Sequence, residues 1–374
     1  MKQIILSIAI LLGIIQGSAC TSAIVSGSLT KDGRPILWKH RDTGEENNKV
    51  ARTTAKDGTF EYIALYNASD KNNREAWIGY NTEGFAIMNT ASYNIKDDNV
   101  KKMDEEGIIM AEALATCSTV NDFERLLITH KKPLRVEANF GVIDALGNGA
   151  YFETNNTTYT KFDLKDTPQG IIVRTNYSHS GRKDEGYGYI REQNAIDLLA
   201  PYIANKSISP EVFTEYISRS FYNSLIGKDF SKDSVEWIVD QDFIPRRIST
   251  ATTCIEGVLK NESPLLTTMW IGIGYPPCSE IRMARTGENG IPIELQASTL
   301  NGHSSLCDTV VKRKNDVFPI KRGSGKSYLN IKKLYNSHGT GYCQILYPIN
   351  RETYRKGYEK LDSIRKQLIP TTKK

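Results

Sequence analysis

The chain has 374 residues and a globular composition, with 39% hydrophobic and 24% charged residues. Its 48 basic and 43 acidic residues are interspersed and leave a net charge of +5, which argues against a nucleic-acid-binding protein. No low-complexity tract or internal repeat is visible.

Residues 1–19 have the pattern of a secretory signal peptide: a basic start, an apolar run over 4–15, and small residues at Gly17 and Ala19. The apolar run is short of the roughly 20 residues that span a bilayer. We therefore expect no stable membrane insertion and a periplasmic or secreted mature chain that begins at Cys20.

A cysteine at the first mature position has three interpretations. In the first, Cys20 carries a thiol and a free α-amine, whose ordinary pKa values of roughly 8.5 and 7.7–8.0 are close enough for the amine to act as the base. In the second, Cys20 is the lipidated residue of a lipoprotein; such signals usually carry Leu three positions earlier, where this chain has Gly17. In the third, Cys20 is a structural cysteine.

The segment after Cys20 predicts a hairpin. Two apolar runs, AIVSGSL and PILWKH, flank Asp32-Gly33, a dipeptide typical of tight hairpin turns. Pairing outward from this turn places Cys20 opposite about residue 45, with Asp42 beside the new N-terminus.

Charged residues near the end of the second strand suit this N-terminus. Asp42 could orient the α-amine, and Lys39 or Arg41 could favour the thiolate by adding positive charge. The alternative for these residues is an ordinary charged strand end.

The motifs CTSAIV and LWKHRDT resemble the start of the cysteine N-terminal-nucleophile (Ntn) hydrolases of the choloylglycine hydrolase and penicillin acyltransferase families. These include bile salt hydrolase, penicillin V acylase and acid ceramidase. They begin with Cys-Thr and carry a segment close to Gly-Arg-Asn-x-Asp, in which Lys39 takes the Arg position and Asp42 the Asp position. Lysine lacks the planar fork of arginine, so Arg41 is an alternative.

Further segments resemble these families. A second hairpin over 76–92, turning at Asn81 to Gly84, resembles a family segment that leads to an asparagine near the nucleophile, which makes Asn89 a candidate oxyanion donor. Asn81 is better explained by turn chemistry. A third hairpin over 137–154 places Asn139 either near the site or in a structural role.

Two later positions complete the candidate set. Thr175-Asn176 resembles the Thr-Asn that ends a central strand in these families, with the asparagine beside the reacting carbonyl. Arg247 precedes a predicted strand where the bile salt hydrolase relatives place an arginine near the cysteine. Its neighbour Arg246 fits that position equally well.

The remaining pattern mixes helices and strands. Helical periodicity predicts two helices over 106–127, with a capping-box-like start at Thr119, and two more over 186–225. Strands are predicted in 243–258 and 265–280, a polar loop over 44–58, and a surface helix over 351–368. The stretch after Leu295 is otherwise hard to interpret.

The six cysteines and five histidines show no metal-ligand spacing, so a zinc site is not expected. Export permits disulfides, and Cys307 with Cys343 is one pairing that the sequence allows without requiring it. A hydrolase site elsewhere, for instance around His40 or His179, also stays open.

Together these patterns predict an α+β chain. The resemblance makes this an αββα four-layer sandwich with two antiparallel sheets, formed by a single catalytic domain over 20–374 whose last 90 or so residues carry little signal. It implies hydrolysis of a linear amide C–N bond in a small N-acyl amine or N-acyl amino acid, such as a conjugated bile salt or a penicillin V type substrate, through a Cys20 thioester. No cofactor or metal is implied, and the oligomeric state is left open. An acyltransferase using the same thioester, or a lipoprotein binding module anchored through Cys20, are the alternatives.

Overall fold

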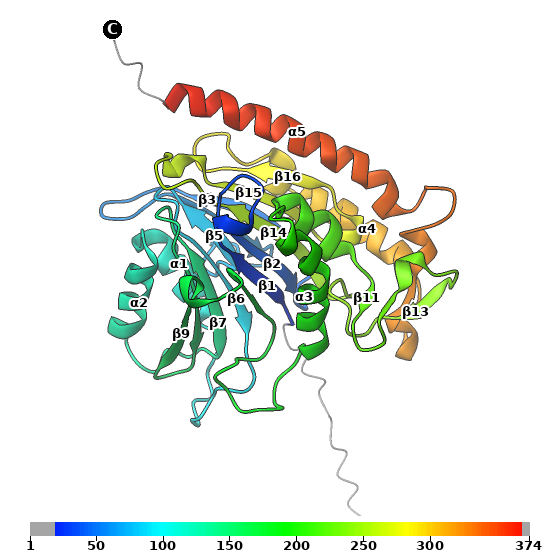
Figure 1. Ribbon diagram of the computed structural model, residues 1–374, viewed down its shortest axis with the longest axis horizontal. Coiled ribbons are helices and arrows are strands. Elements are labelled where there is room, and N and C mark those ends of the chain that lie inside the picture. Colours follow the sequence, from blue (N-terminus) through cyan, green and yellow to red (C-terminus); the bar gives the residue numbers. More distant parts are fainter. Residues whose placement is uncertain (1–18, 369–374) are drawn as a thin grey trace, which may run out of the picture.

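A computed structural model describes residues 19–368 (Figure 1). The predicted signal peptide, apart from Ala19, lies outside them. One antiparallel sheet of six strands carries the N-terminus of the described chain. Its order is β10 (Ile171–Arg174), β1 (Thr21–Val25), β2 (Ile36–Asp42), β14 (Ser249–Glu256), β15 (Thr268–Ile273) and β16 (Ile281–Ala284).

A second antiparallel sheet follows the chain in sequence order. Its seven strands are β3 (Asn48–Thr53), β4 (Tyr62–Asn67), β5 (Ile78–Asn81), β6 (Ala86–Ala91), β7 (Ala138–Ile143), β8 (Gly149–Thr154) and β9 (Tyr159–Asp163). Both predicted hairpins of this sheet are confirmed, and Gly84 and Gly147 adopt the positive φ that their turns require. The predicted polar loop over 44–58 is wrong in part, because β3 forms there as the edge strand of the sheet.

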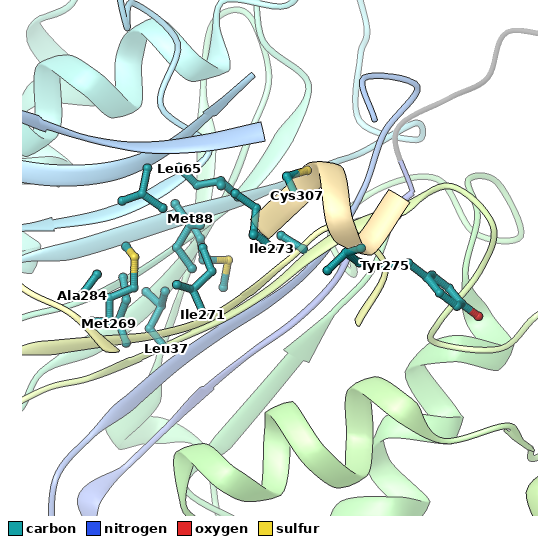
Figure 2. Close-up of a cluster of buried hydrophobic side chains, with 14 of the residues drawn as sticks. Leu37, Leu65, Met88, Met269, Ile271, Ile273, Tyr275, Ala284 and Cys307 are labelled. Carbon is teal, nitrogen blue, oxygen red and sulfur yellow. The ribbon is translucent and has the colours of Figure 1, made fainter. Parts of the chain in front are cut away.

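The two sheets pack against each other through a shared apolar core. Ile24 and Leu37 of the first sheet belong to the same buried cluster as Leu65 and Met88 of the second. Figure 2 shows Leu37, Leu65, Met88 and Ile271 facing one another between the strands. Alternate residues of β1 and β2 therefore face this inner core, and the others face outward.

Helices α1 (Glu106–Thr116) and α2 (Val120–Thr129) cover the outer face of the seven-stranded sheet, as predicted. Phe123 and Leu127 of α2 pack with Phe140 and Phe152 from the strands. The capping box at Thr119 is confirmed, because its side chain accepts from the Asp122 N–H while the Asp122 carboxylate accepts from the Thr119 N–H.

Helix α3 (Tyr189–Ala204) and the C-terminal α5 (Tyr342–Leu368) cover the outer face of the six-stranded sheet. The second helix expected before residue 225 is only a π turn, Val212–Tyr216, followed by a 3-10 turn. The predicted surface helix is part of α5, which also buries Tyr354 and Leu361. Figure 1 shows α5 along the top of the molecule and α2 at its left edge.

The layers are thus helix, sheet, sheet and helix, which is the predicted αββα sandwich. Helix α4 (Ser305–Val317) joins the core between the sheets through Leu306 and Val310, in a region where the sequence had indicated nothing. Two short ribbons complete the fold: β11 (Tyr222–Asn223) with β12 (Lys228–Asp229), and β13 (Trp237–Val239) with β17 (Tyr328–Asn330).

The first hairpin differs in register from the prediction. Thr21 pairs with His40 and Val25 with Ile36, so Cys20 lies opposite Arg41 rather than near residue 45. The reason is the connection, which is a longer loop containing a 3-10 turn at Gly27–Leu29 instead of a tight turn at Asp32-Gly33.

All six cysteines lie within the described residues and none is part of a disulfide, so the allowed Cys307–Cys343 bond does not form. The Cys307 and Cys343 thiols instead donate to the backbone carbonyls of Glu46 and Pro277. Across residues 19–368, no group of His, Cys, Asp and Glu side chains is arranged to hold a metal ion. No helix in that span has the length and apolar character needed to cross a membrane.

Candidate functional site

Cys20 lies directly before β1, an interior strand of the six-stranded sheet. Because side chains alternate along a strand, its thiol lies on the same face as Ser22 and Ile24, the face toward the other sheet. The thiol is 3.8 Å from the backbone carbonyl oxygen of Asp42 and is only 2% exposed. Ala19 precedes it here, so the Cys20 nitrogen is part of a peptide bond.

Two arginines hold the backbone around Cys20. Arg191 of α3, which is 1% exposed, donates from Nη1 to the carbonyl oxygens of Cys20 (2.7 Å) and Ala19 (3.2 Å) and to Thr21 Oγ1 (2.9 Å). Arg246 donates from Nη2 to the same Ala19 carbonyl oxygen at 2.8 Å. Two guanidinium groups from distant segments therefore converge on the peptide carbonyl that precedes Cys20.

Asp42 ends β2 and is fully buried. Its Oδ2 accepts from Arg246 Nη2 at 2.5 Å and Nε at 3.3 Å, and its Oδ1 accepts from Ser249 Oγ at 2.5 Å. A serine hydroxyl has one proton, so His40 Nε2 must donate to Ser249 Oγ, 2.8 Å away. Burial lowers the pKa of His40 to about 4, which keeps the imidazole neutral. The charge of Asp42 is therefore balanced by Arg246.

Of the two adjacent arginines, Arg246 belongs to this network and the Arg247 side chain does not. The Arg247 side chain makes no hydrogen bond to Asp42 or Cys20, and its backbone N–H donates to Asp240 Oδ2 at 2.7 Å. Arg246, the alternative that the sequence left open, is the residue that contacts Asp42. Adjacent residues before a strand point in different directions, so the one-residue difference decides which side chain reaches the site.

Lys39 and Arg41 both lie on the Cys20 face of β2 and both interact electrostatically with the thiol. Lys39 Nζ donates to Asn89 Oδ1 at 2.7 Å and to the Trp77 carbonyl oxygen at 2.9 Å. Burial lowers the pKa of Lys39 to about 8. Because lysine only donates, the oxygen of the Asn89 amide must face it, and the Asn89 NH2 group is left to face elsewhere.

Arg41 is held differently. Its guanidinium donates to Asn48 Oδ1 and to Asn67 Oδ1 and lies 5.0 Å from the centre of the Trp77 ring. These three side chains fix the cation on the inner face, beside the strand position of Cys20. The two basic residues thus have separate partners: Lys39 positions Asn89, and Arg41 contributes charge.

Asn176 follows β10, and its backbone pairs with Tyr187. Its Oδ1 accepts from Arg191 Nη2 at 2.9 Å, and its Nδ2 donates to the Ala91 carbonyl oxygen at 2.8 Å. Arg191 therefore links Asn176 directly to the Cys20 backbone. The strand itself differs from the family expectation, because β10 is the edge strand of its sheet rather than a central one.

A scan against protein-family models finds no match, and a search of curated proteins finds none either. Solved structures that resemble the chain include the conjugated bile acid hydrolase from Clostridium perfringens, in a mutant form. It is 12% identical, with a TM-score of 0.43, over 71% of this chain and 92% of that one. The Caenorhabditis elegans ortholog of N-acylethanolamine-hydrolyzing acid amidase is 12% identical, with a TM-score of 0.39, over 66% and 93%.

Penicillin V acylase from Agrobacterium tumefaciens is 9% identical, with a TM-score of 0.38, over 71% of this chain and 86% of that one. The bile acid hydrolase and the penicillin V acylase belong to the families that the N-terminal motifs resemble.

Arg191 is the site residue that sequence reasoning missed. It lies four and eight residues before Ala195 and Leu199, which pack on the six-stranded sheet, so the 3.6-residue period already placed it on the buried face of α3. A buried arginine needs hydrogen-bond acceptors around it, so an arginine on the buried face of a helix was the signal that could have pointed to this residue. The side-chain amides of Asn81 and Asn139 donate to backbone carbonyl oxygens of neighbouring segments.

Proposed function

We propose that this protein is an exported amidase that hydrolyses a linear, non-peptide amide C–N bond through a thioester on Cys20. The observation that carries the proposal is the meeting of a thiol, two cations and a buried carboxylate–arginine pair around Cys20, directly before an interior strand. Lys39 and Arg41 lie on the thiol side, and Arg246 bridges the Asp42 carboxylate to the carbonyl oxygen of Ala19, the residue before Cys20.

Removal of residues 1–19 would release the α-amine of Cys20 at the end of the strand. That amine takes the thiol proton, and the resulting thiolate is attracted by the positive charges of Lys39 and Arg41. Asp42 accepts a hydrogen bond from the amine, and Arg246 holds the Asp42 carboxylate in place. Nucleophile and base are then parts of one residue, and no histidine is needed.

The thiolate sulfur attacks the substrate carbonyl carbon, and the carbonyl oxygen becomes an oxyanion. The Asn89 NH2 group, oriented by Lys39, is the donor best placed by its own contacts to stabilise it, with Asn176 as the second. The C–N bond breaks as the α-ammonium gives its proton to the leaving amine. Water, deprotonated by the α-amine, then attacks the thioester, releases the carboxylic acid and restores the thiol.

The substrate class proposed is a small N-acyl amine or N-acyl amino acid, such as a conjugated bile salt or a penicillin V type amide. The proposal includes cleavage before Cys20 and a periplasmic or secreted location. If an amine or thiol captured the thioester faster than water, the same residues would perform acyl transfer.

The test is N-terminal and intact mass spectrometry of the exported protein, before and after mild iodoacetamide, followed by amidase assays on a panel of N-acyl amines. Burial raises the pKa of the other five thiols, whereas Lys39 and Arg41 place positive charge near the Cys20 thiol. One fast alkylation, on Cys20, is therefore expected, with loss of amidase activity.

The variant Cys20→Ala should lose activity, and Cys343→Ala, which removes another buried thiol, should retain it. A diacylglyceryl increment on Cys20 would overturn the proposal and indicate a lipoprotein binding module. Cleavage that leaves Cys20 internal or removes it would also overturn it. Activity that survives Cys20 alkylation would move the chemistry to another site, such as the surroundings of His40 or His179.

A further inference from the structure

A short ribbon, β13 with β17, presents large side chains on the surface of the molecule. In β13, Ile238 is buried, whereas its neighbours Trp237 and Val239 are 45% and 56% exposed. Tyr328 of β17 pairs with Val239 in the antiparallel register, so the two side chains lie on the same face, and Tyr328 is 39% exposed. Trp237, Val239 and Tyr328 therefore point away from the core together, and we call them the ribbon face.

The segment that leads into β17 is basic. Residues 320–333 contain five Lys or Arg residues and no Asp or Glu. Lys321, Arg322 and Lys326 are exposed, and none of the three forms an ion pair with a described residue. Lys321 Nζ donates to the side-chain amide oxygen of Asn315, which is uncharged. We call residues 320–327 the basic turn, and its three exposed cations are not neutralised within the described part of the chain.

The basic turn lies beside the ribbon face. Its 3-10 portion, Gly323–Ser327, runs directly into β17. The Ser324 and Tyr328 hydroxyl groups are 3.5 Å apart, so the turn folds back along the Tyr328 side chain. Within the turn, Ile320 packs against Gly325 and is itself 38% exposed. Apolar side chains and cations thus adjoin on one surface.

Acidic side chains near this surface have partners of their own. The Glu236 Oε1 atom accepts from Asn330 Nδ2 at 3.0 Å, and Asp240 Oδ2 accepts from a backbone N–H at 2.7 Å. Asp316 pairs with Lys333 at 3.1 Å. The cations of the basic turn are therefore left to attract an anionic partner, and this attraction acts over about 10 Å at moderate salt.

A lipid surface suits this combination of side chains. Trp and Tyr favour the boundary between lipid headgroups and acyl chains, because each ring is apolar and carries a polar N–H or O–H group. Lys and Arg residues beside them are attracted by anionic headgroups. The ribbon is unsuited to a peptide, since strands of three residues offer few backbone groups for pairing. Figure 1 shows β13 at the edge of the molecule, where a flat surface can reach it.

We propose that the ribbon face docks the protein peripherally on a bilayer that contains anionic lipids. Trp237, Val239 and Tyr328 enter the headgroup region, and the three cations of the basic turn bind the lipid phosphates at its surface. Such docking needs no membrane-spanning segment. It is independent of the chemistry proposed for Cys20, and it can be measured whether or not the protein is an amidase.

The experiment measures binding of the full exported chain to large unilamellar vesicles, by co-sedimentation and by tryptophan fluorescence. One set of vesicles contains phosphatidylcholine alone, and the other contains phosphatidylglycerol and phosphatidylcholine in equal parts. Trp38 and Trp270 are fully buried and Trp77 is half-buried, so a blue shift of the emission on binding reports mainly on Trp237.

The apolar half of the proposal is tested by Trp237→Ser. Its control is Ile128→Ser, at a side chain of α2 that is 62% exposed. Figure 1 shows α2 at the left edge of the molecule and β13 at the right. We expect Trp237→Ser to weaken binding to the anionic vesicles about tenfold or more and to remove most of the blue shift, and Ile128→Ser to change neither. Both positions are exposed, so both variants should fold.

The electrostatic half is tested by the double variant Arg322→Ser with Lys326→Ser. Its control, Lys71→Ser with Lys131→Ser, removes the same charge at exposed positions outside the ribbon face and the basic turn. The native chain should bind the anionic vesicles at least tenfold more tightly than phosphatidylcholine alone. The double variant should lose about tenfold or more of this binding, and its control should keep it.

Equal binding to both kinds of vesicle, no binding to the anionic vesicles, or ribbon and turn variants that bind as the native chain does would overturn the proposal. A lipid anchor on Cys20 would give the first of these results. Sensitivity to the charge variant alone, with Trp237→Ser unchanged and inorganic polyphosphate bound equally well, would overturn the lipid assignment and indicate a site for soluble polyanions.

Discussion

The contact between Arg246 and Asp42 predicts that two adjacent arginines differ sharply in their effect on stability. Arg246→Met removes two hydrogen bonds to a fully buried carboxylate and one to the Ala19 carbonyl oxygen. Removing one partner of a buried ion pair costs about 3–5 kcal/mol. The Arg246 side chain is 19% exposed, so water can partly replace it, and we expect a loss of about 2–4 kcal/mol.

Arg247→Met is the matched control. The Asp240 contact of Arg247 uses its backbone N–H and survives the substitution, so the expected loss is below about 1 kcal/mol. Urea unfolding at pH 7 measures both losses. In an Asp42→Asn background, the cost of Arg246→Met should fall by about 1 kcal/mol or more, because the paired charge is gone. Equal losses for the two arginines, or no coupling with Asp42, would refute this account of the site.

Three further predictions concern polar groups. Because burial lowers the pKa of Lys39 to about 8, Lys39 loses its positive charge and activity should decline as the pH rises through 8. Lys39→Met should remove that decline and lower kcat about tenfold or more. A pH–rate profile of both proteins measures the two effects. Asn89→Ala should lower kcat by a factor of about 100 with little change in urea midpoint, whereas Asn81→Ala, which loses four backbone bonds, should cost about 2 kcal/mol or more. Burial raises the pKa of Glu256 to about 8. The folded state therefore binds the extra proton, and the free energy of unfolding should fall as the pH rises from 4.5 to 8. Glu256→Gln should flatten that slope in unfolding curves, and an unchanged slope would contradict this.

Local patterns were sufficient for much of the fold. The hairpins at Asn81–Gly84 and Gly147–Gly149 and the capping box at Thr119 depend on residues a few positions apart, and all three were predicted. Alternation of apolar residues placed most strands, and the 3.6-residue period placed the helices α1, α2 and α3. Segments whose stability comes from distant partners were missed. β3 is polar in sequence and forms because β4 pairs with it, and α4 is stabilised by the core between the sheets.

The same limit applies to the site. Cys20, Lys39 and Asp42 come from one hairpin, so their proximity could be inferred from sequence spacing. Arg191 and Arg246 reach Cys20 from about 170 and 226 residues further along the chain. Only the packing of α3 on the first sheet, and the pairing of β14 with β2 within that sheet, bring them there. Which of two adjacent arginines faces inward depends on backbone direction before β14, which composition does not specify.

The register of the first hairpin shows why one error left the site prediction intact. The predicted partner of Cys20, near residue 45, and the observed partner, Arg41, differ by an even number of positions. An even shift leaves every side chain on its original face of the sheet, whereas a shift of one would exchange the faces. Lys39 and Arg41 therefore remain on the side of the thiol in either register.

Asp42 lies on the opposite face, and this position suits the role proposed for it. The thiol belongs to the inner face of the strand, but the Cys20 nitrogen belongs to the backbone and is accessible from both faces. A carboxylate on the outer face, balanced by Arg246 and held by Ser249, can bind a backbone amine without approaching the sulfur. The strand thus separates the two electrostatic requirements of the proposed reaction: cations beside the thiolate on one face, and an anion beside the amine on the other.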